Sequence, residues 1–135
     1  MDFVTAVVWL SMNCFYECRN EPQAGQVAVA QVVLNRAKKC KSSAKETILL
    51  DSQFSWTKYD LHKTGGYVDP LDSAGMGSLV GCVKSSIIAM SVDDLTGGAT
   101  FYHTTDISPY WANGKKSIMT IGHHTFYGGQ DFRCR

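Results

Sequence analysis

A proline-marked break close to the N-terminus is the feature of this sequence that most restricts its fold. Arg19-Asn20-Glu21-Pro22 separates an apolar stretch that begins at Phe3 from a second one at residues 27–34. The residue before a proline is disfavoured in helical geometry, so one helix is expected to end here. Asn20 and Gln23 have the spacing of a capping box, which predicts that a second helix begins at once. The chain therefore opens as two helices joined by a short turn.

The first helix is expected from about Asp2 to Arg19, with Asp2 as its N-cap. One stripe at helical spacing consists of Phe3, Val7, Leu10, Cys14 and Glu17. Apolar residues also lie on the other faces of this helix. Such a pattern is typical of a buried central helix, and it places Glu17 on a core-facing position.

The rest of the chain predicts one more helix and a small sheet. The second helix ends in Lys38, Lys39 and Lys41, residues 42–72 carry only a weak pattern, and Tyr59 to Asp72 are expected to form a long loop. A third helix is expected from about Met76 to Val92, with an apolar face of Leu79, Val80, Val83, Ile87 and Met90. Ala99 to His103 and Ser117 to Tyr127 have the pattern of antiparallel strands around a loop at 106–116. Helices first and strands later predict an α+β fold.

Composition narrows the class of protein. The 135 residues fit a single domain, 1–135, and 44% hydrophobic with 19% charged residues is a globular composition. A net charge of +1 gives no reason to expect nucleic acid as a partner. No segment approaches the roughly 20 apolar residues of a membrane span, so membrane insertion is not expected. We expect a monomer that uses no metal and no cofactor.

Five cysteines make an odd number, unlike most secreted disulfide scaffolds. The sequence therefore predicts mostly reduced thiols in a protein synthesised in the cytoplasm. Met1-Asp2 places an acid where a secretory signal has basic residues, so no signal peptide is expected.

Glu17 is the residue whose position most suggests chemistry. Carboxylates are rarely buried without a partner or a function. Burial and the nearby helix C-terminus both raise the pKa of a carboxyl, as a general acid near neutral pH requires. The alternative is a structural Glu17 paired with Arg19 or Arg36. Glu21 begins the second helix, where the dipole lowers a carboxyl pKa, so it is expected to act as a cap or in a salt bridge.

Several segments, in order, resemble a known family: Phe15–Pro22, Gly25–Ala30, Val33–Arg36, Gln53–Ser55, Gly98–His103 and Ile121–Tyr127. Together they resemble the SleB-like cell wall hydrolases, a family of spore-cortex lytic enzymes and phage lysins. Its closing segment has the form Ile-Gly-x-His-x-Phe-Tyr. Cys18 and Asn20 depart from the family pattern, which prefers Ala and Gly at these positions.

The resemblance implies a lysozyme-like helical lobe beside a small sheet. It also implies cleavage of peptidoglycan glycan strands between N-acetylmuramic acid and N-acetylglucosamine, with Glu17 as the catalytic residue. Ordinary glycosidases use two carboxylates, and the matched segments hold no second acid beyond Glu21. A single acid favours a lytic transglycosylase, which forms a 1,6-anhydro sugar without consuming water. The alternative is a muramidase that uses one of three aspartates as second carboxylate: Asp51, Asp60 or Asp106.

Six further residues are candidates for substrate contact, each with a structural alternative: Gln53, Ser55, Tyr102, His103, Trp111 and His124. Gln53 and Ser55 carry polar groups that suit the acid or the N-acetyl groups, or that cap turns. The ring of Trp111 suits stacking on a sugar or packing in a core. His124 matches the closing histidine of the family and is expected to brace the sheet against the catalytic helix.

Three other classes of function compete with this prediction. A cysteine peptidase is disfavoured because Cys14 and Cys18 lie towards the C-terminal end of their helix, where the dipole opposes a thiolate. A zinc site built from these thiols and His103, His123 and His124 lacks the usual ligand spacing. A non-catalytic cell-wall-binding module leaves a core glutamate unexplained. Without a signal peptide, the enzyme is expected to reach the wall after release or injection, as a phage endolysin does.

Overall fold

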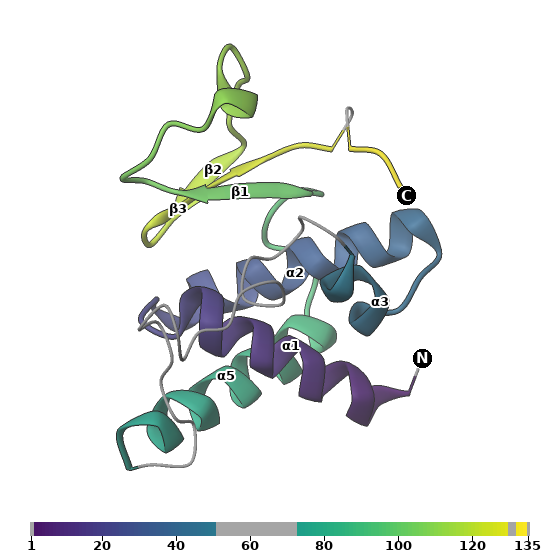
Figure 1. The fold of residues 1–135 in the computed structure, drawn as a ribbon, viewed down its shortest axis with the longest axis vertical. Helices are drawn as coiled ribbons and strands as arrows, with labels where there is room; N and C mark the ends of the chain where they lie inside the picture. Colours follow the sequence, from purple (N-terminus) through teal and green to yellow (C-terminus); the bar gives the residue numbers. More distant parts are fainter. Residues whose placement is uncertain (1, 51–72, 130–131, 135) are drawn as a thin grey trace.

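A layer of helices beneath a small sheet makes up the fold. The computed structural model describes residues 2–50, 73–129 and 132–134. Its main helices are α1 (Phe3–Cys18), α2 (Gln23–Cys40), α3 (Ala44–Leu49) and α5 (Ser73–Ser91). The strands β1 (Phe101–Thr104), β2 (Met119–Ile121) and β3 (His124–Tyr127) form an antiparallel sheet in the order β1-β3-β2, which lies over α2 (Figure 1). The predicted α+β class is confirmed.

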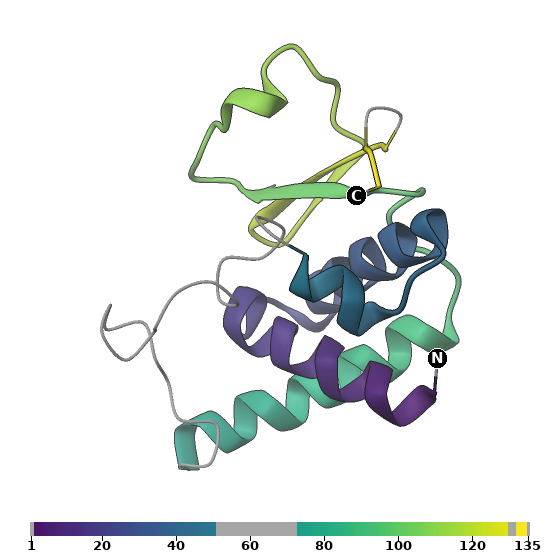
Figure 2. The same ribbon diagram turned by 45° about the vertical axis from the view of Figure 1, so that its right-hand side comes forward.

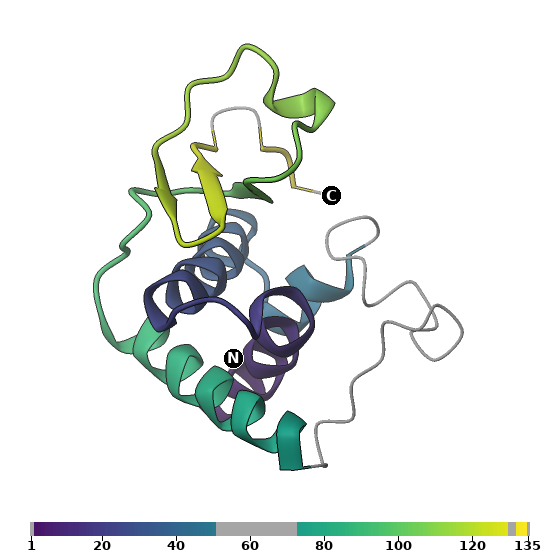
Figure 3. The ribbon, with the colours of Figure 1, turned by 90° about the vertical axis from the view of Figure 1, so that its left-hand side faces the viewer.

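α2, and not α1, is the central helix. Asp2 caps α1 as predicted, since its Oδ1 accepts a hydrogen bond of 2.7 Å from the backbone N–H of Thr5. However, Val4 and Val8 on α1 are 69% and 48% exposed, so the prediction of a helix buried on all sides is wrong. Residues 25–33 of α2 are all buried, because the sheet covers one side of this helix and α5 lies on another (Figures 2 and 3).

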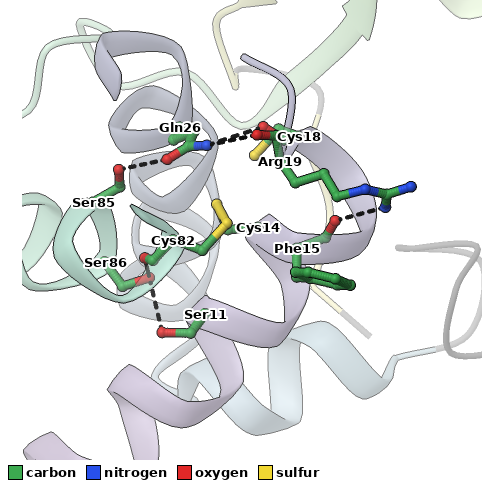
Figure 4. The surroundings of a disulfide bond; sticks show 9 residues. All are labelled: Ser11, Cys14, Phe15, Cys18, Arg19, Gln26, Cys82, Ser85 and Ser86. Atoms are coloured by element: carbon green, nitrogen blue, oxygen red, sulfur yellow. Dashed lines mark hydrogen bonds between the residues drawn. A yellow bond between two sulfur atoms is a disulfide. The ribbon is translucent and has the colours of Figure 1, made fainter. Parts of the chain in front are cut away.

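The turn between α1 and α2 is held by Gln26. The predicted capping box of Asn20 and Gln23 is absent, since α2 begins after Pro22 with no side-chain cap. Instead, Nε2 of Gln26 donates to two carbonyl oxygens at the end of α1, that of Arg19 at 3.2 Å and that of Cys18 at 3.4 Å (Figure 4). The Cys18 oxygen also accepts from the backbone N–H of Glu21 at 3.0 Å.

α5 turns a face of small residues to the other helices. Its buried residues include Cys82, Ser85, Ser86 and Ala89. Of the predicted apolar face, Leu79 and Met90 pack against the core, whereas Val80 and Ile87 are exposed, so that face is only partly correct. Small side chains allow a close approach, and the hydroxyl of Ser85 donates to Oε1 of Gln26 at 2.7 Å. Figure 4 shows this contact beside the disulfide that joins α5 to α1.

Two disulfides replace the expected reduced thiols. Cys14 pairs with Cys82, and Cys40 at the end of α2 pairs with Cys134, while Cys18 stays a buried free thiol. The second bond is reinforced by Lys39, whose Nζ donates to the carbonyl oxygens of Gly129 at 2.7 Å and Phe132 at 3.2 Å. One disulfide therefore joins two helices of the layer, and the other joins the end of α2 to the C-terminal segment.

Two local features differ from the sequence prediction. α3 was not predicted, although Ser43 and Glu46 form a complete capping box at its start. The expected strand at 117–127 is two strands, because Gly122, at a φ of +58°, turns the chain between β2 and β3. Among the described helices, none has the length and apolar character needed to cross a bilayer.

The two faces of the sheet have different environments. Tyr102 on β1 lies opposite Phe126 on β3, and both contact the helical core. Phe101 and His103 alternate with Tyr102 and lie beside the ring of Trp111, at centroid distances of 5.3 and 5.6 Å. The strand therefore sends successive side chains to opposite faces of the sheet.

Candidate active site

Glu17 opens onto a pocket where the end of α1 meets the β2–β3 hairpin. The pocket has a volume of about 270 Å³ and is lined by eight residues: Tyr16, Glu17, Cys18, Arg19, Asn20, Glu21, His123 and His124. Glu17 lies in the last turn of α1 and is half-buried. The stripe that places it there continues from Leu10 and Cys14, which are fixed in the core.

The environment of Glu17 suits a proton donor. Burial raises the pKa of its carboxyl to about 7, against an opposing effect of the positive charge of Arg36. Among the described residues, no hydrogen bond or ion pair is made by this carboxyl. No ion pair joins it to Arg19, whose Nη1 donates to the carbonyl oxygen of Phe15 at 3.0 Å. A carboxyl that stays partly protonated at neutral pH is what a general acid requires.

Tyr102 is a predicted substrate-contact residue whose hydroxyl interacts electrostatically with Glu17. Burial raises the pKa of its hydroxyl well above the usual value, and the charges of Glu17 and Cys18 raise it further against the effect of Arg36. Arg36 is itself buried, and its Nε donates to the carbonyl oxygen of Thr100 at 2.6 Å. The neutral hydroxyl of Tyr102 and the buried guanidinium of Arg36 thus both interact electrostatically with the Glu17 carboxyl.

The cysteines beside the pocket do not suit nucleophilic chemistry. Burial, followed by the charges of Glu17 and Glu21, raises the pKa of the Cys18 thiol far above its usual value. Cys14 is in a disulfide. The states of these two cysteines disfavour the cysteine peptidase.

Within the described parts of the chain, no three His, Cys, Asp or Glu side chains gather closely enough to hold a metal ion.

Glu21 fastens the hairpin to the turn between the helices. Its Oε1 accepts hydrogen bonds of 2.6 Å from the backbone N–H of His123 and from Nδ1 of His124, and its Oε2 accepts one of 2.7 Å from Nδ1 of His123. Burial alone would raise the pKa of Glu21, but these hydrogen bonds outweigh it and the pKa is lowered. Glu21 does not cap α2, as was one expectation. It does form the expected salt bridges, with His123 and His124 as its partners. His124 therefore braces the sheet against this turn through Glu21.

Two predicted residues in the described part of the chain, His103 and Trp111, lie apart from Glu17. His103 lies on the opposite face of the sheet, where its Nε2 is 2.8 Å from the hydroxyl of Tyr127 and its ring contacts Trp111. It lines a separate pocket of about 520 Å³ together with Tyr110 and Asn113. Gln53 and Ser55 lie outside the described residues, so their roles stay predictions.

His123 is the site residue that sequence reasoning missed, apart from its place in the weak zinc hypothesis. One sequence feature could have indicated His123: it directly follows Gly122, and a glycine that forms a turn places the next residue at the tip of that turn. The turn itself was not predicted, because residues 117–127 have the alternation of one continuous strand.

Comparisons with known proteins identify the family to which the chain belongs. Residues 20–127 match the family model of the cell wall hydrolases. The catalytic domain of the germination-specific lytic transglycosylase SleB from Bacillus anthracis is similar at 26% identity, with a TM-score of 0.65, over 90% of this chain and 93% of that one. The catalytic domain of the Bacillus cereus SleB protein is similar at 27% identity, with a TM-score of 0.59, over 91% and 90%. No curated protein matches the sequence significantly. The family match covers most of the chain, so this protein belongs to the cell wall hydrolase family.

Proposed function

We propose that the protein is a lytic transglycosylase that cleaves peptidoglycan glycan strands between N-acetylmuramic acid and N-acetylglucosamine, with Glu17 as its acid. The observation that carries the proposal is the half-buried Glu17 carboxyl, with a pKa of about 7, on the wall of the pocket. The similarity to a SleB domain described as a lytic transglycosylase supports the same reaction.

The proposed reaction needs one proton to be given and one to be taken. Protonated Glu17 donates its proton to the glycosidic oxygen as the bond from that oxygen to the anomeric carbon breaks. The 6-hydroxyl of the muramic acid then bonds to the anomeric carbon, and ionised Glu17 accepts the hydroxyl proton. The product is a 1,6-anhydro sugar, and Glu17 is returned to its protonated state.

A muramidase is the alternative, and it needs a second carboxylate to act on water or on the sugar. Asp51 and Asp60 lie outside the described residues. Asp106 is exposed, and the Thr104 hydroxyl lowers its pKa, with smaller effects from His123 and His124. A phage endolysin setting for either activity stays a prediction.

Mass spectrometry of digested peptidoglycan tests the proposal. We expect 1,6-anhydro muropeptides from the wild type and a loss of at least about 100-fold in rate for Glu17→Gln, in line with the usual contribution of a general acid. Glu46→Gln is the matched control, because Glu46 is exposed on α3 and glutamine also serves in a capping box. Reducing-end products would identify a muramidase, and an active Glu17→Gln variant would refute the site.

A further inference from the structure

His123 combines high exposure with a fixed orientation. Its side chain is 79% exposed, yet its ring Nδ1 and its backbone N–H both bond to the carboxylate of Glu21. An exposed side chain normally samples several rotamers, and holding one of them requires such anchoring. The ring is therefore set in one direction before any ligand arrives, which reduces the entropy lost on binding.

The anchor also decides which ring nitrogen is available. An ionised carboxylate only accepts hydrogen bonds, so the hydrogen of a neutral His123 ring lies on Nδ1. Nε2 then carries the lone pair and is an acceptor. Among the described residues, no group is bonded to this Nε2. Since His123 lines the same pocket as Glu17, its neutral ring brings an oriented acceptor to the wall of the space beside the acid.

Locking Glu21 in place does not require the His123 ring. Without that ring, the Oε1 of Glu21 would still accept from the backbone N–H of His123 and from His124 Nδ1. The ring is therefore available for a contact with something outside the chain.

We infer that His123 is a substrate-contacting residue, whose Nε2 accepts a hydrogen bond from a hydroxyl or acetamido N–H of an amino sugar bound beside Glu17. The inference rests on the proposed function and deepens it, because it assigns one contact between the pocket and the glycan. Glu21 acts through His123 and is a positioning residue.

Two conservative variants separate this role from a purely structural one. In His123→Gln, the side-chain amide reaches the position of Nε2 and keeps an acceptor there, but the contact with Glu21 is lost. In His123→Asn, the amide occupies the position of Nδ1 and keeps the contact with Glu21, but nothing replaces Nε2. Substrate contact predicts that His123→Gln binds glycan better than His123→Asn, and a structural role predicts the reverse order.

The experiment measures the affinity of soluble, uncross-linked glycan strands by calorimetry, with Glu17→Gln as the background so that nothing is cleaved. We expect His123→Asn and His123→Ala to bind about 2- to 10-fold more weakly, the range of one hydrogen bond, and His123→Gln to stay within about 2-fold of the background. Thr120→Ala, an exposed change on the same hairpin, is the control for folding. Unchanged affinity in all three variants, or the reverse order, would overturn the inference. Product analysis of the wild type tests the proposed function separately.

Discussion

Gln26 donates a hydrogen bond to the carbonyl oxygen of Arg19, and so ties the residue after α1 to the first turn of α2. The same side chain accepts from Ser85 on α5. One buried amide thus links three helices next to Glu17. A polar group buried at such a position leaves several partners unsatisfied when it is removed.

Replacement of Gln26 should therefore affect both stability and activity. Gln26→Ala is expected to lower the free energy of unfolding by about 1–3 kcal/mol, because the Arg19 carbonyl and the Ser85 hydroxyl lose their partner. Gln31→Ala is the matched control, since Gln31 is also buried on α2 but bonds to residues 93 and 95 at the other end. Urea unfolding should show a loss for both variants, and glycan cleavage should fall more for Gln26→Ala. Equal loss of activity would contradict a special role for the turn.

Glu17 should make stability depend on pH in a defined direction. Its folded pKa of about 7 lies above the usual glutamate value of 4.5, so the folded state binds more protons between these values. Stability from this group is present below about pH 4.5 and is lost as pH rises to 7, by up to about 3 kcal/mol. Glu17→Gln removes this effect. The difference in unfolding free energy between variant and wild type should therefore grow in favour of the variant from pH 4.5 to 8, and a flat difference would contradict a buried carboxyl.

The pH dependence of activity should follow the same group. Cleavage should fall as pH rises through about 7, because the protonated fraction of Glu17 decreases. Initial rates measured on the same glycan strands across this range test the expectation. Glu46→Gln should keep the wild-type profile, and a rate that rises steadily with pH would exclude Glu17 as the acid.

Gly122 gives a test of the hairpin that does not alter any polar group. A Cβ at this position would lie 3.1 Å from both carboxylate oxygens of Glu21 and 3.1 Å from Cδ of Pro22. Gly122→Ala therefore adds crowding to the strain of a positive φ, which alone is about 1–2 kcal/mol. Gly114→Ala is the control, because its φ is +77° but nothing lies within 4 Å of the new Cβ. Thermal unfolding should show a larger loss for Gly122→Ala, and only that variant should lose activity.

The two disulfides should differ in their resistance to reduction. Cys14 and Cys82 are almost fully buried, whereas Cys134 is exposed. A mild reductant should therefore open Cys40–Cys134 first, with a loss of roughly 2–4 kcal/mol in stability. Alkylation followed by peptide mass spectrometry checks the order, with buried Cys18 as an internal reference. Early labelling of Cys14 would contradict the burial of that bond.

The parts of the fold predicted from the sequence are those set by local pattern. The Asp2 cap, the break before Pro22 and the strand containing Tyr102 all follow from neighbouring residues. The rotation of α5 does not, because its buried face is chosen by close packing of Ser85 and Ser86 against other helices. Helical periodicity alone favoured the larger apolar side chains, of which Val80 and Ile87 are exposed.

The site was predictable to a similar extent. Glu17 could be found from one chain because a carboxylate on an apolar stripe is unusual within a single helix. The contacts of Glu21 could not, since its partners are 102 and 103 residues away and depend on a turn at Gly122. The disulfides depend likewise on tertiary structure, which an odd number of cysteines does not reveal.

The alternation of side chains along β1 makes the length of this strand critical. Tyr102 lies towards the acid and His103 lies away from it, although they are adjacent. If one residue were inserted or deleted in β1 before Tyr102 and the strand still paired with β3, each side chain that follows would move to the other face of the sheet. The imidazole of His103 would then replace the phenol of Tyr102 in the core. On the outer face, Trp111 would lose its ring contact with His103.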